Sequence, residues 1–174
     1  MKTFINFFLV LFVLQGFISC DKIDELTEVD FDTTINEQLN VTVQAGENMV
    51  LNETMLININ NQDTEKYLNV IQNVRITSFT YRLIDFSGDS EGTIVGNFVA
   101  DGVQLVDHDM IVKQIVDAGT IFEVTNVAQL NTIASKLKSG KDVLIGVEGE
   151  SKCSEAMIFT MAVTIDLEVT ADVL

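Results

Sequence analysis

The stretch MIFTMAVTIDLEV, residues 157–169, decides the fold class of this chain. Every odd-numbered position in it is apolar: Met157, Phe159, Met161, Val163, Ile165, Leu167 and Val169. The even-numbered positions are mostly polar, and Asp166 and Glu168 indicate that this side meets water. Alternation with a period of two is typical of a β-strand with one buried face. At ~3.3 Å per residue the strand would span roughly 40 Å, so we expect it to bend or to pass between two sheets.

The same alternation appears twice in the first third of the chain and predicts a hairpin there. Residues 39–45 alternate, and residues 49–59 alternate with a single interruption at Glu53. The segment between them, 46–48, has the sequence Gly-Glu-Asn, which favours a turn. We therefore expect the two segments to pair with each other and to bury one face.

The middle of the chain predicts further strands. In residues 74–86 the apolar positions change parity near Ser78, which indicates a β-bulge or a bend. Asp101-Gly102 favours a two-residue turn between a second pair of hairpin strands. The segment 110–116 fits neither a helical nor a strand pattern clearly. The other expected strands are 93–100, 103–106, 121–124 and 141–149.

Two segments have a helical pattern. The first is short, at about 63–72, where Asp63 is suited to cap the first turn. The second covers 126–138, with Asn126 as its N-cap and Gly140 just beyond its end. Its apolar stripe consists of Val127, Leu130, Ile133, Ala134 and Leu137.

Together these elements predict an all-β fold. We expect an antiparallel β-sandwich, immunoglobulin-like in topology, with seven to nine strands and the two short helices. A small closed sheet is the alternative. The sandwich is expected to form a single domain over residues 31–174.

The composition excludes some classes of function. The chain contains 26 acidic and 10 basic residues, which gives a formal net charge of −16. Such a chain is repelled by the phosphates of nucleic acid and by anionic lipid surfaces, so nucleic acid is not an expected partner. The hydrophobic content of 47% is too high for a disordered, solvated chain.

Residues 1–20, MKTFINFFLVLFVLQGFISC, have the pattern of a secretory signal. Lys2 gives a positive start, and residues 4–14 are apolar except for Asn6. This apolar run is well below the ~20 residues that a membrane-spanning helix needs. A cleaved signal peptide is therefore favoured over a transmembrane anchor.

The end of this segment resembles the lipobox of bacterial lipoproteins. Ile18, Ser19 and Cys20 fit the motif, whereas Phe17 stands where leucine is usual. The resemblance implies cleavage between Ser19 and Cys20, which leaves residues 1–19 as the signal peptide, and diacylglycerol on the Cys20 sulfur. An ordinary signal peptide that ends near a cysteine is the alternative.

The segment 20–30 after the cleavage site is rich in acids and is expected to be a tether between lipid and domain. Its first residues, 21–25, resemble the export signal of surface lipoproteins in the Bacteroidota. This resemblance implies an outer-membrane location, with the domain either periplasmic or surface-exposed.

The candidate metal ligands are the carboxylates of the turn-forming segment around 85–91. Asp85, Asp89 and Glu91 offer oxygen ligands of the kind that Ca²⁺ prefers, although their spacing is not that of an EF-hand. A hydrated turn without calcium is the alternative, and no other cofactor is expected. Further ligands from nearby loops are possible: Asp101, Asp107 and Asp109.

Catalytic residues are not evident. His108 is flanked by two aspartates, but neighbours on an extended chain point apart, so a solvated turn is the favoured interpretation. Cys153 is expected to be an unpaired thiol near the end of a strand, since Cys20 would carry lipid. The three lysines near the end of the second helix fit the helix dipole: Lys136, Lys138 and Lys141.

The sequence thus favours a non-enzymatic envelope lipoprotein. Lipid on Cys20 would hold it to the membrane, and its β-domain would contact another envelope protein as an accessory subunit. The alternative is a surface module that binds a glycan, a small molecule or calcium. An enzyme is the third hypothesis, and it would require polar residues from distant strands to meet in a cleft.

Overall fold

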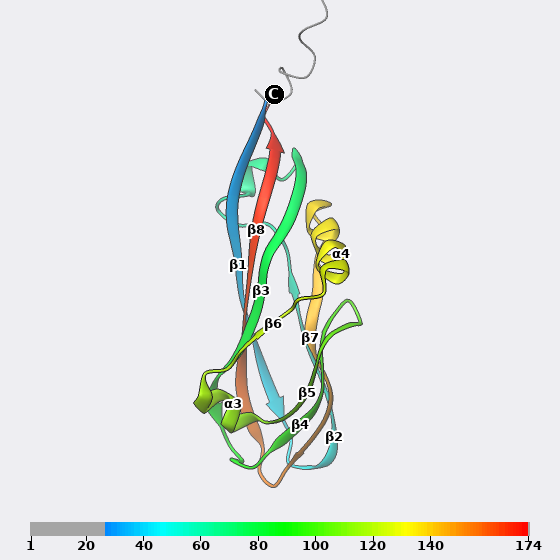
Figure 1. Cartoon of the computed structure of the whole chain (residues 1–174). Helices are drawn as coiled ribbons and strands as arrows, with labels where there is room; N and C mark the ends of the chain where they lie inside the picture. Colours follow the sequence, from blue (N-terminus) through cyan, green and yellow to red (C-terminus); the bar gives the residue numbers. More distant parts are fainter. Residues whose placement is uncertain (1–26, 174) are drawn as a thin grey trace, which may run out of the picture.

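The computed structural model describes residues 27–173, which fold into two antiparallel sheets that face each other (Figure 1). The first sheet has the order β1 (Glu28–Val43), β8 (Met157–Asp172), β3 (Ile71–Ser87) and β6 (Ile121–Glu123). The second has the order β2 (Gly46–Ile57), β7 (Val143–Cys153), β4 (Thr93–Ala100) and β5 (Val103–Ile111). The predicted all-β sandwich with seven to nine strands is confirmed.

The strand order is that of a jelly roll. The first strand pairs with the last, β1 with β8, and the pairs β2·β7, β3·β6 and β4·β5 follow inward. An eight-stranded double sheet of this kind is a jelly roll, whereas the immunoglobulin order sets four strands against three. The immunoglobulin-like order that the sequence suggested is thus replaced by another arrangement within the same sandwich class.

Strand β8 is the centre of the first sheet. It pairs along its length with β1 on one side and β3 on the other. Each of the seven odd-numbered apolar side chains from Met157 to Val169 is at most 1% exposed. The alternation therefore identified the buried face correctly. The strand remains within one sheet and does not pass to the second.

The first predicted hairpin does not form. Residues 28–43 lie in the first sheet and residues 46–57 in the second, so Gln44 and Ala45 connect the two sheets instead of two paired strands. The inward face was predicted correctly, since Leu51 and Ile57 are buried. Alternation shows which side of a strand meets the core, but it carries no information about the neighbouring strand.

The predictions for the middle of the chain hold better. The pairing of β3 with β8 shifts between Ile76 and Ser78, where the change of parity indicated a bulge. Strands β4 and β5 form the second predicted hairpin. Its turn residues Asp101 and Gly102 have φ values of 50° and 72°, as a two-residue turn with two positive φ angles requires.

The second predicted helix is confirmed as α4 (Val127–Lys138). The side chain of Asn126 accepts hydrogen bonds from the backbone N–H groups of Ala128 and Gln129, as an N-cap does. Gly140 follows the helix with a φ of 67°. The ambiguous segment 110–116 contains the end of β5 and the start of a third element, α3 (Val112–Ala118).

The first predicted helix is much shorter than expected. The segment 63–72 contains only η1 (Glu65–Tyr67), a single 3-10 turn. Asp63 does not cap it. Instead the side chain of Asn61 accepts from the backbone N–H groups of Asp63 and Thr64, which favours a turn over a helix.

The domain begins earlier than predicted. Strand β1 starts at Glu28, where the acidic tether was expected to continue to residue 30, and Glu28 lies opposite Asp172 at the end of β8. The start of β1 and the end of β8 thus share one end of the sandwich (Figure 1). The predicted signal peptide and Cys20 lie outside the described residues. Between residues 27 and 173, no helix has the length and apolar character needed to cross a bilayer.

Candidate functional site

The predicted calcium ligands lie at the end of the sandwich opposite the start of β1. The Asp89 carboxylate accepts hydrogen bonds from the backbone N–H and the hydroxyl of Ser154, at 2.5 and 2.8 Å, and from the Glu91 N–H at 3.0 Å. These bonds, from Ser154 first and Glu91 second, lower the pKa of Asp89. Asp89 therefore fastens the β3–β4 loop to the β7–β8 turn.

The other two candidate ligands do not join Asp89. Asp85 and Glu91 are both exposed. Within the described part of the chain, no three side chains of His, Cys, Asp or Glu gather closely enough to hold a metal ion. The structure thus gives Asp89 a role in joining two turns, and it leaves calcium binding without a formed site.

His108 occupies a different environment from the solvated turn that its neighbours suggested. It lies on β5 and is half-buried, with Nε2 hydrogen-bonded to the hydroxyl of Tyr81 on β3. Its ring meets the ring of Phe122 on β6, with centroids 4.6 Å apart. Burial lowers the pKa of His108, and the charge of Asp107 opposes this shift. His108 therefore joins the two sheets, and the solvated-turn interpretation was wrong.

On the outer face of the second sheet, two rows of side chains run across the four strands. Each row has an acidic residue on β7 and another on β5. In the first row Val50, Glu150, Val95 and Asp109 are successive partners across the strands. In the second row the partners are Asn52, Glu148, Asn97 and Asp107. Sequence analysis could not find these rows, because the residues of each row come from strands whose pairing only the fold reveals.

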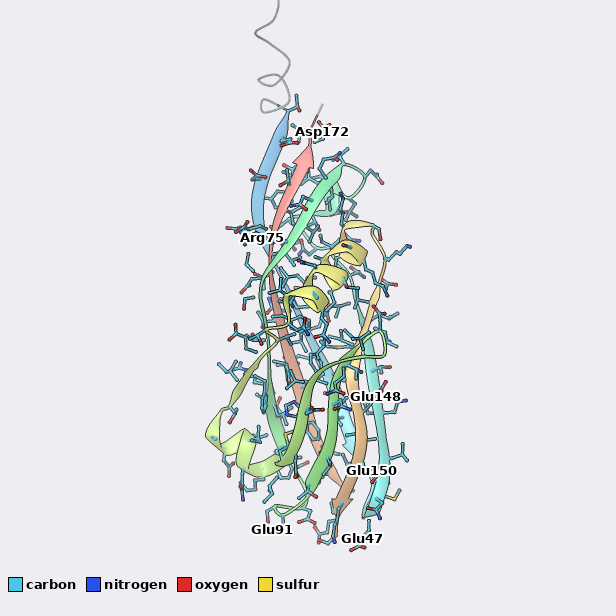
Figure 2. The ribbon with its side chains drawn as sticks, turned by 45° about the vertical axis from the view of Figure 1, so that its right-hand side comes forward. Glu47, Arg75, Glu91, Glu148, Glu150 and Asp172 are labelled. Atoms are coloured by element: carbon cyan, nitrogen blue, oxygen red, sulfur yellow. The ribbon has the colours of Figure 1, made fainter. Side chains whose placement is uncertain are left out.

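We call the four carboxylates of these rows, Asp107, Asp109, Glu148 and Glu150, the acidic rows. Asp107, Asp109 and Glu150 line an open groove of about 480 Å³ along β4, whose floor includes the exposed side chain of Val95. Glu148 is the cross-strand partner of Asn97, another lining residue. Figure 2 shows Glu148 and Glu150 following one another along β7. Between residues 27 and 173, no lysine or arginine forms an ion pair with any of the four. The groove therefore presents uncompensated negative charge.

Two glycines lie beneath this groove. Gly96 on β4 is the partner of Gly149 on β7. A Cβ on Gly149 would lie 2.4 Å from the carbonyl oxygen of Val95 and 2.5 Å from the Cα of Gly96. Gly149 also has a φ of 157°, at the edge of the region that favours glycine. The two strands approach too closely here for any larger residue.

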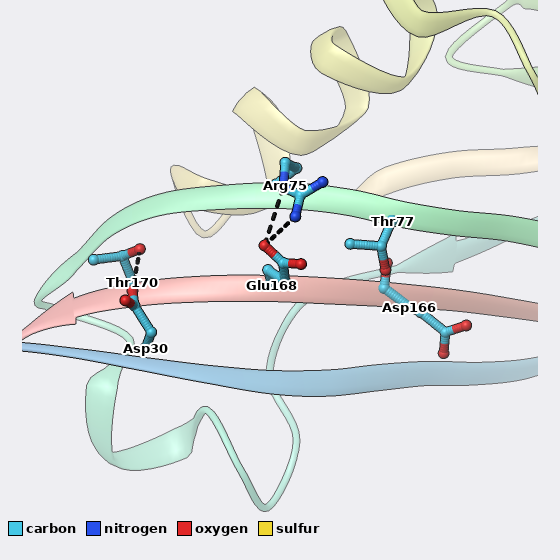
Figure 3. A network of polar contacts seen from close by, with 6 residues as sticks. All are labelled: Asp30, Arg75, Thr77, Asp166, Glu168 and Thr170. Carbon is cyan, nitrogen blue, oxygen red and sulfur yellow. Dashed lines mark hydrogen bonds and ion pairs between the residues drawn. The ribbon is translucent and has the colours of Figure 1, made fainter.

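The outer face of the first sheet is polar but internally paired. Arg75 on β3 forms an ion pair with Glu168 on β8, and the Thr170 hydroxyl donates to Asp30 on β1 at 2.7 Å (Figure 3). Figure 3 also shows Thr77 beside Asp166, whose backbone carbonyl accepts from the Thr77 hydroxyl at 3.1 Å. Glu168 is thus paired with a cation, whereas Asp30 and Asp166 accept hydrogen bonds from threonine hydroxyls and keep their negative charge.

The remaining residues singled out in the sequence have structural roles. Lys136 at the end of α4 pairs with Asp101 in the β4–β5 turn at 2.6 Å, while Lys138 and Lys141 are exposed. Cys153, the last residue of β7, is buried and unpaired, and its Sγ lies 3.2 Å from the carbonyl oxygen of Gln44. Burial raises the pKa of this thiol, which makes it less reactive.

Comparison with known proteins identifies no family. No protein family matches the chain, and no curated protein resembles it in sequence. Decameric BFDV capsid protein is similar at 10% identity and a TM-score of 0.43, over 81% of this chain and 99% of that one. Desmodium yellow mottle tymovirus is similar at 13% identity and a TM-score of 0.36, over 83% and 84%. TM-scores this low carry no conclusion about function.

Proposed function

We propose that this chain is a lipid-anchored, non-enzymatic accessory protein of a bacterial outer membrane. In this proposal its β-domain docks another envelope protein through the acidic rows. The observation that carries the proposal is that the acidic rows, three of whose carboxylates line the groove at Val95, have no ion-paired cation in the described structure. An exposed surface of one charge attracts and orients a partner of the opposite charge.

The position of the acidic rows supports this function. With lipid on Cys20, the anchored end of the domain would be the one where β1 begins, close to Asp172. Glu148 and Glu150 lie nearer the other end, where Glu47 and Glu91 are found (Figure 2). A partner fixed to the same membrane would then meet the domain on its side, well above the anchored end.

The charge of the groove specifies the chemistry of the partner. Lysine or arginine side chains would lay their methylene stems on Val95 and their charged groups beside the carboxylates. At physiological salt, the attraction between exposed charges is largely screened when they are more than ~8 Å apart. Binding should therefore be rapid at low ionic strength and should weaken as salt is added.

The test is capture of partners from solubilised membranes with the native lipidated protein. We expect wild type to recover a partner, and the double variant Glu148→Gln/Glu150→Gln to recover at least fivefold less. The control is Glu28→Gln/Glu123→Gln, which removes the same charge from exposed positions outside the groove. Recovery of the bare monomer alone by wild type would contradict the proposal.

A second candidate function is the binding of a small ligand at the cell surface. One observation favours it, a cavity of about 170 Å³ between α4 and the β4–β5 hairpin, with Leu105 and Ile133 among its lining residues. This volume is below the ~300 Å³ at which ligand pockets usually begin, so only a fragment-sized ligand would fit. Chemical-shift changes at Ile133 on addition of such a compound would support this function.

A further inference from the structure

Strand β2 has a free edge. It pairs only with β7, so among the described residues its other side has no neighbouring strand. Helices α3 and α4 pack mainly against β3, away from this edge. The amide and carbonyl groups that alternate along the free edge are therefore available to hydrogen-bond an additional strand.

The outward side chains of this edge are partly apolar. Val50 is 83% exposed and Leu56 is 58% exposed, with Asn52 and Thr54 between them on the same face. The other long edge strand, β1, differs, because all its outward side chains from Glu28 to Thr42 are charged or polar. A long edge with exposed apolar residues is a site where strands add, so β2 is the edge suited to docking.

Glu53 stands in the middle of β2 on the face that points between the sheets, in series with Leu51 and Met55. It determines which strand can pair. If a second copy added antiparallel, the register that sets Val50 opposite Leu56 would set Glu53 opposite Glu53. Like charges directly opposite each other destabilise a strand pair. A second copy of this chain is therefore the wrong partner in the register that best matches the apolar residues.

We propose that the free edge of β2 binds an extended segment of the partner protein as an added antiparallel strand. This segment has apolar residues opposite Val50 and Leu56 and a lysine or arginine opposite Glu53. The inference rests on the proposed docking function and adds a second contact to the acidic rows. Backbone hydrogen bonds supply affinity in such β-addition, and the alternating side chains supply specificity. Glu53 selects the partner because it favours a cation and repels a second copy.

The test uses synthetic peptides with the sequence of residues 48–58, NMVLNETMLIN, and the protein purified from its membrane. In the antiparallel register such a peptide sets its own residue 53 opposite Glu53 of the protein. We expect the peptide with Glu53→Lys to bind at least tenfold more tightly than the peptide of native sequence. A third peptide, in which this lysine is exchanged with the neighbouring Asn52, carries the same charge on the wrong face. It should bind several-fold more weakly than the Glu53→Lys peptide, because no cation then faces Glu53.

Protein variants locate the binding. Val50→Lys/Leu56→Lys should abolish peptide binding, and both positions are exposed enough for the fold to be kept. Ile121→Lys/Val127→Lys, which changes two similarly exposed positions on β6 and α4, should bind the peptide as wild type does. Equal affinity for all three peptides, no binding of the Glu53→Lys peptide, or unchanged binding by Val50→Lys/Leu56→Lys would overturn the inference.

Capture from membranes separates this inference from the proposed function. If wild type and Val50→Lys/Leu56→Lys recover the same partner equally, the free edge of β2 is not the contact and the docking function stands. If neither recovers a partner, the docking function fails. The peptide affinities then still decide whether the edge accepts a basic strand.

Discussion

The hydroxyl of Tyr81 on β3 is hydrogen-bonded to Nε2 of His108 on β5, which ties the first sheet to the second. The ring of Phe122 stacks on Tyr81 and meets His108 edge-on, with centroid distances of 5.1 and 4.6 Å. Three elements far apart in the sequence thus meet at one half-buried polar contact. Because the contact is half-buried, a group that loses its partner there is only partly compensated by water.

Replacement of Tyr81 by phenylalanine should reduce stability. The variant removes the hydroxyl and leaves Nε2 of His108 half-buried without its partner, a cost of about 1–3 kcal/mol in the free energy of unfolding. Urea denaturation measures this. The matched control is Tyr67→Phe, whose ring packs on Phe31 without a comparable hydrogen bond and which should change stability by less than about 0.5 kcal/mol. Equal losses in the two variants would show that the contact contributes nothing.

The pH dependence of stability should contain a contribution from His108. Burial lowers the pKa of His108 in the folded state, and only the charge of Asp107 opposes this. The unfolded chain, with a histidine pKa of ~6.5, then binds a proton more readily than the folded chain. Stability is fully present above this value and falls as the pH drops toward the folded pKa. The free energy of unfolding should therefore decrease between pH 7.5 and 5.5 more in wild type than in His108→Gln. Parallel curves for the two proteins would be inconsistent with this assignment.

The sequence predicts local properties of this fold well. In β8 and β3 the parity of the apolar residues identified the buried face, because burial of one face produces a period of two in the sequence. In β3 the change of parity also located the irregularity near Ser78. The order of the strands, in contrast, cannot be predicted from this local pattern. Nothing in residues 39–45 distinguishes pairing with β2 from pairing with β8, which lies more than a hundred residues away.

The candidate site was less accessible to sequence reasoning. The acids beside His108 suggested a solvated turn. Val106, His108 and Met110, however, occupy alternate positions of one strand, and this alternation was the overlooked signal that His108 faces inward. The acidic rows depend on the register between β5, β4 and β7. Glu148 and Asp107 become members of one row only after three strands are aligned, and no local pattern encodes that alignment.

A methyl group at Gly149 should destabilise the domain strongly. Its Cβ would meet the backbone of Val95 and Gly96 at 2.4–2.5 Å, and backbone cannot move aside without separating β4 from β7. We expect Gly149→Ala to lower the free energy of unfolding by about 2–4 kcal/mol. Gly140→Ala is the control, because its φ is 67° but nothing lies within 4 Å of the added Cβ. It should cost only about 1 kcal/mol. A smaller loss at Gly149 than at Gly140 would contradict the close approach.

Calcium should not stabilise the protein measurably. The Asp89 carboxylate already accepts hydrogen bonds from Ser154 and Glu91, so a bound ion would have to replace them. An ion that binds the folded state and not the unfolded state raises the melting temperature, and it does so more the tighter it binds. Thermal melts in the presence of roughly 1 mM Ca²⁺ and in the presence of excess chelator should coincide. A clear upward shift with Ca²⁺ that Asp89→Asn abolishes would restore the calcium site.

The proposed anchor makes the sharpest prediction about the chain as a whole. If the Cys20 sulfur carries diacylglycerol, two acyl chains with ~0.8 kcal/mol for each buried CH₂ hold the protein stably to the bilayer. Mass spectrometry of the mature protein should then find an acylated cysteine at its N-terminus. Cys20→Ala should move the protein from the membrane fraction to the soluble fraction. Cys153→Ala is the matched control, since that buried thiol hydrogen-bonds only within the domain and should leave fractionation unchanged. An unmodified N-terminus at another residue, or membrane association that survives Cys20→Ala, would exclude the lipid anchor.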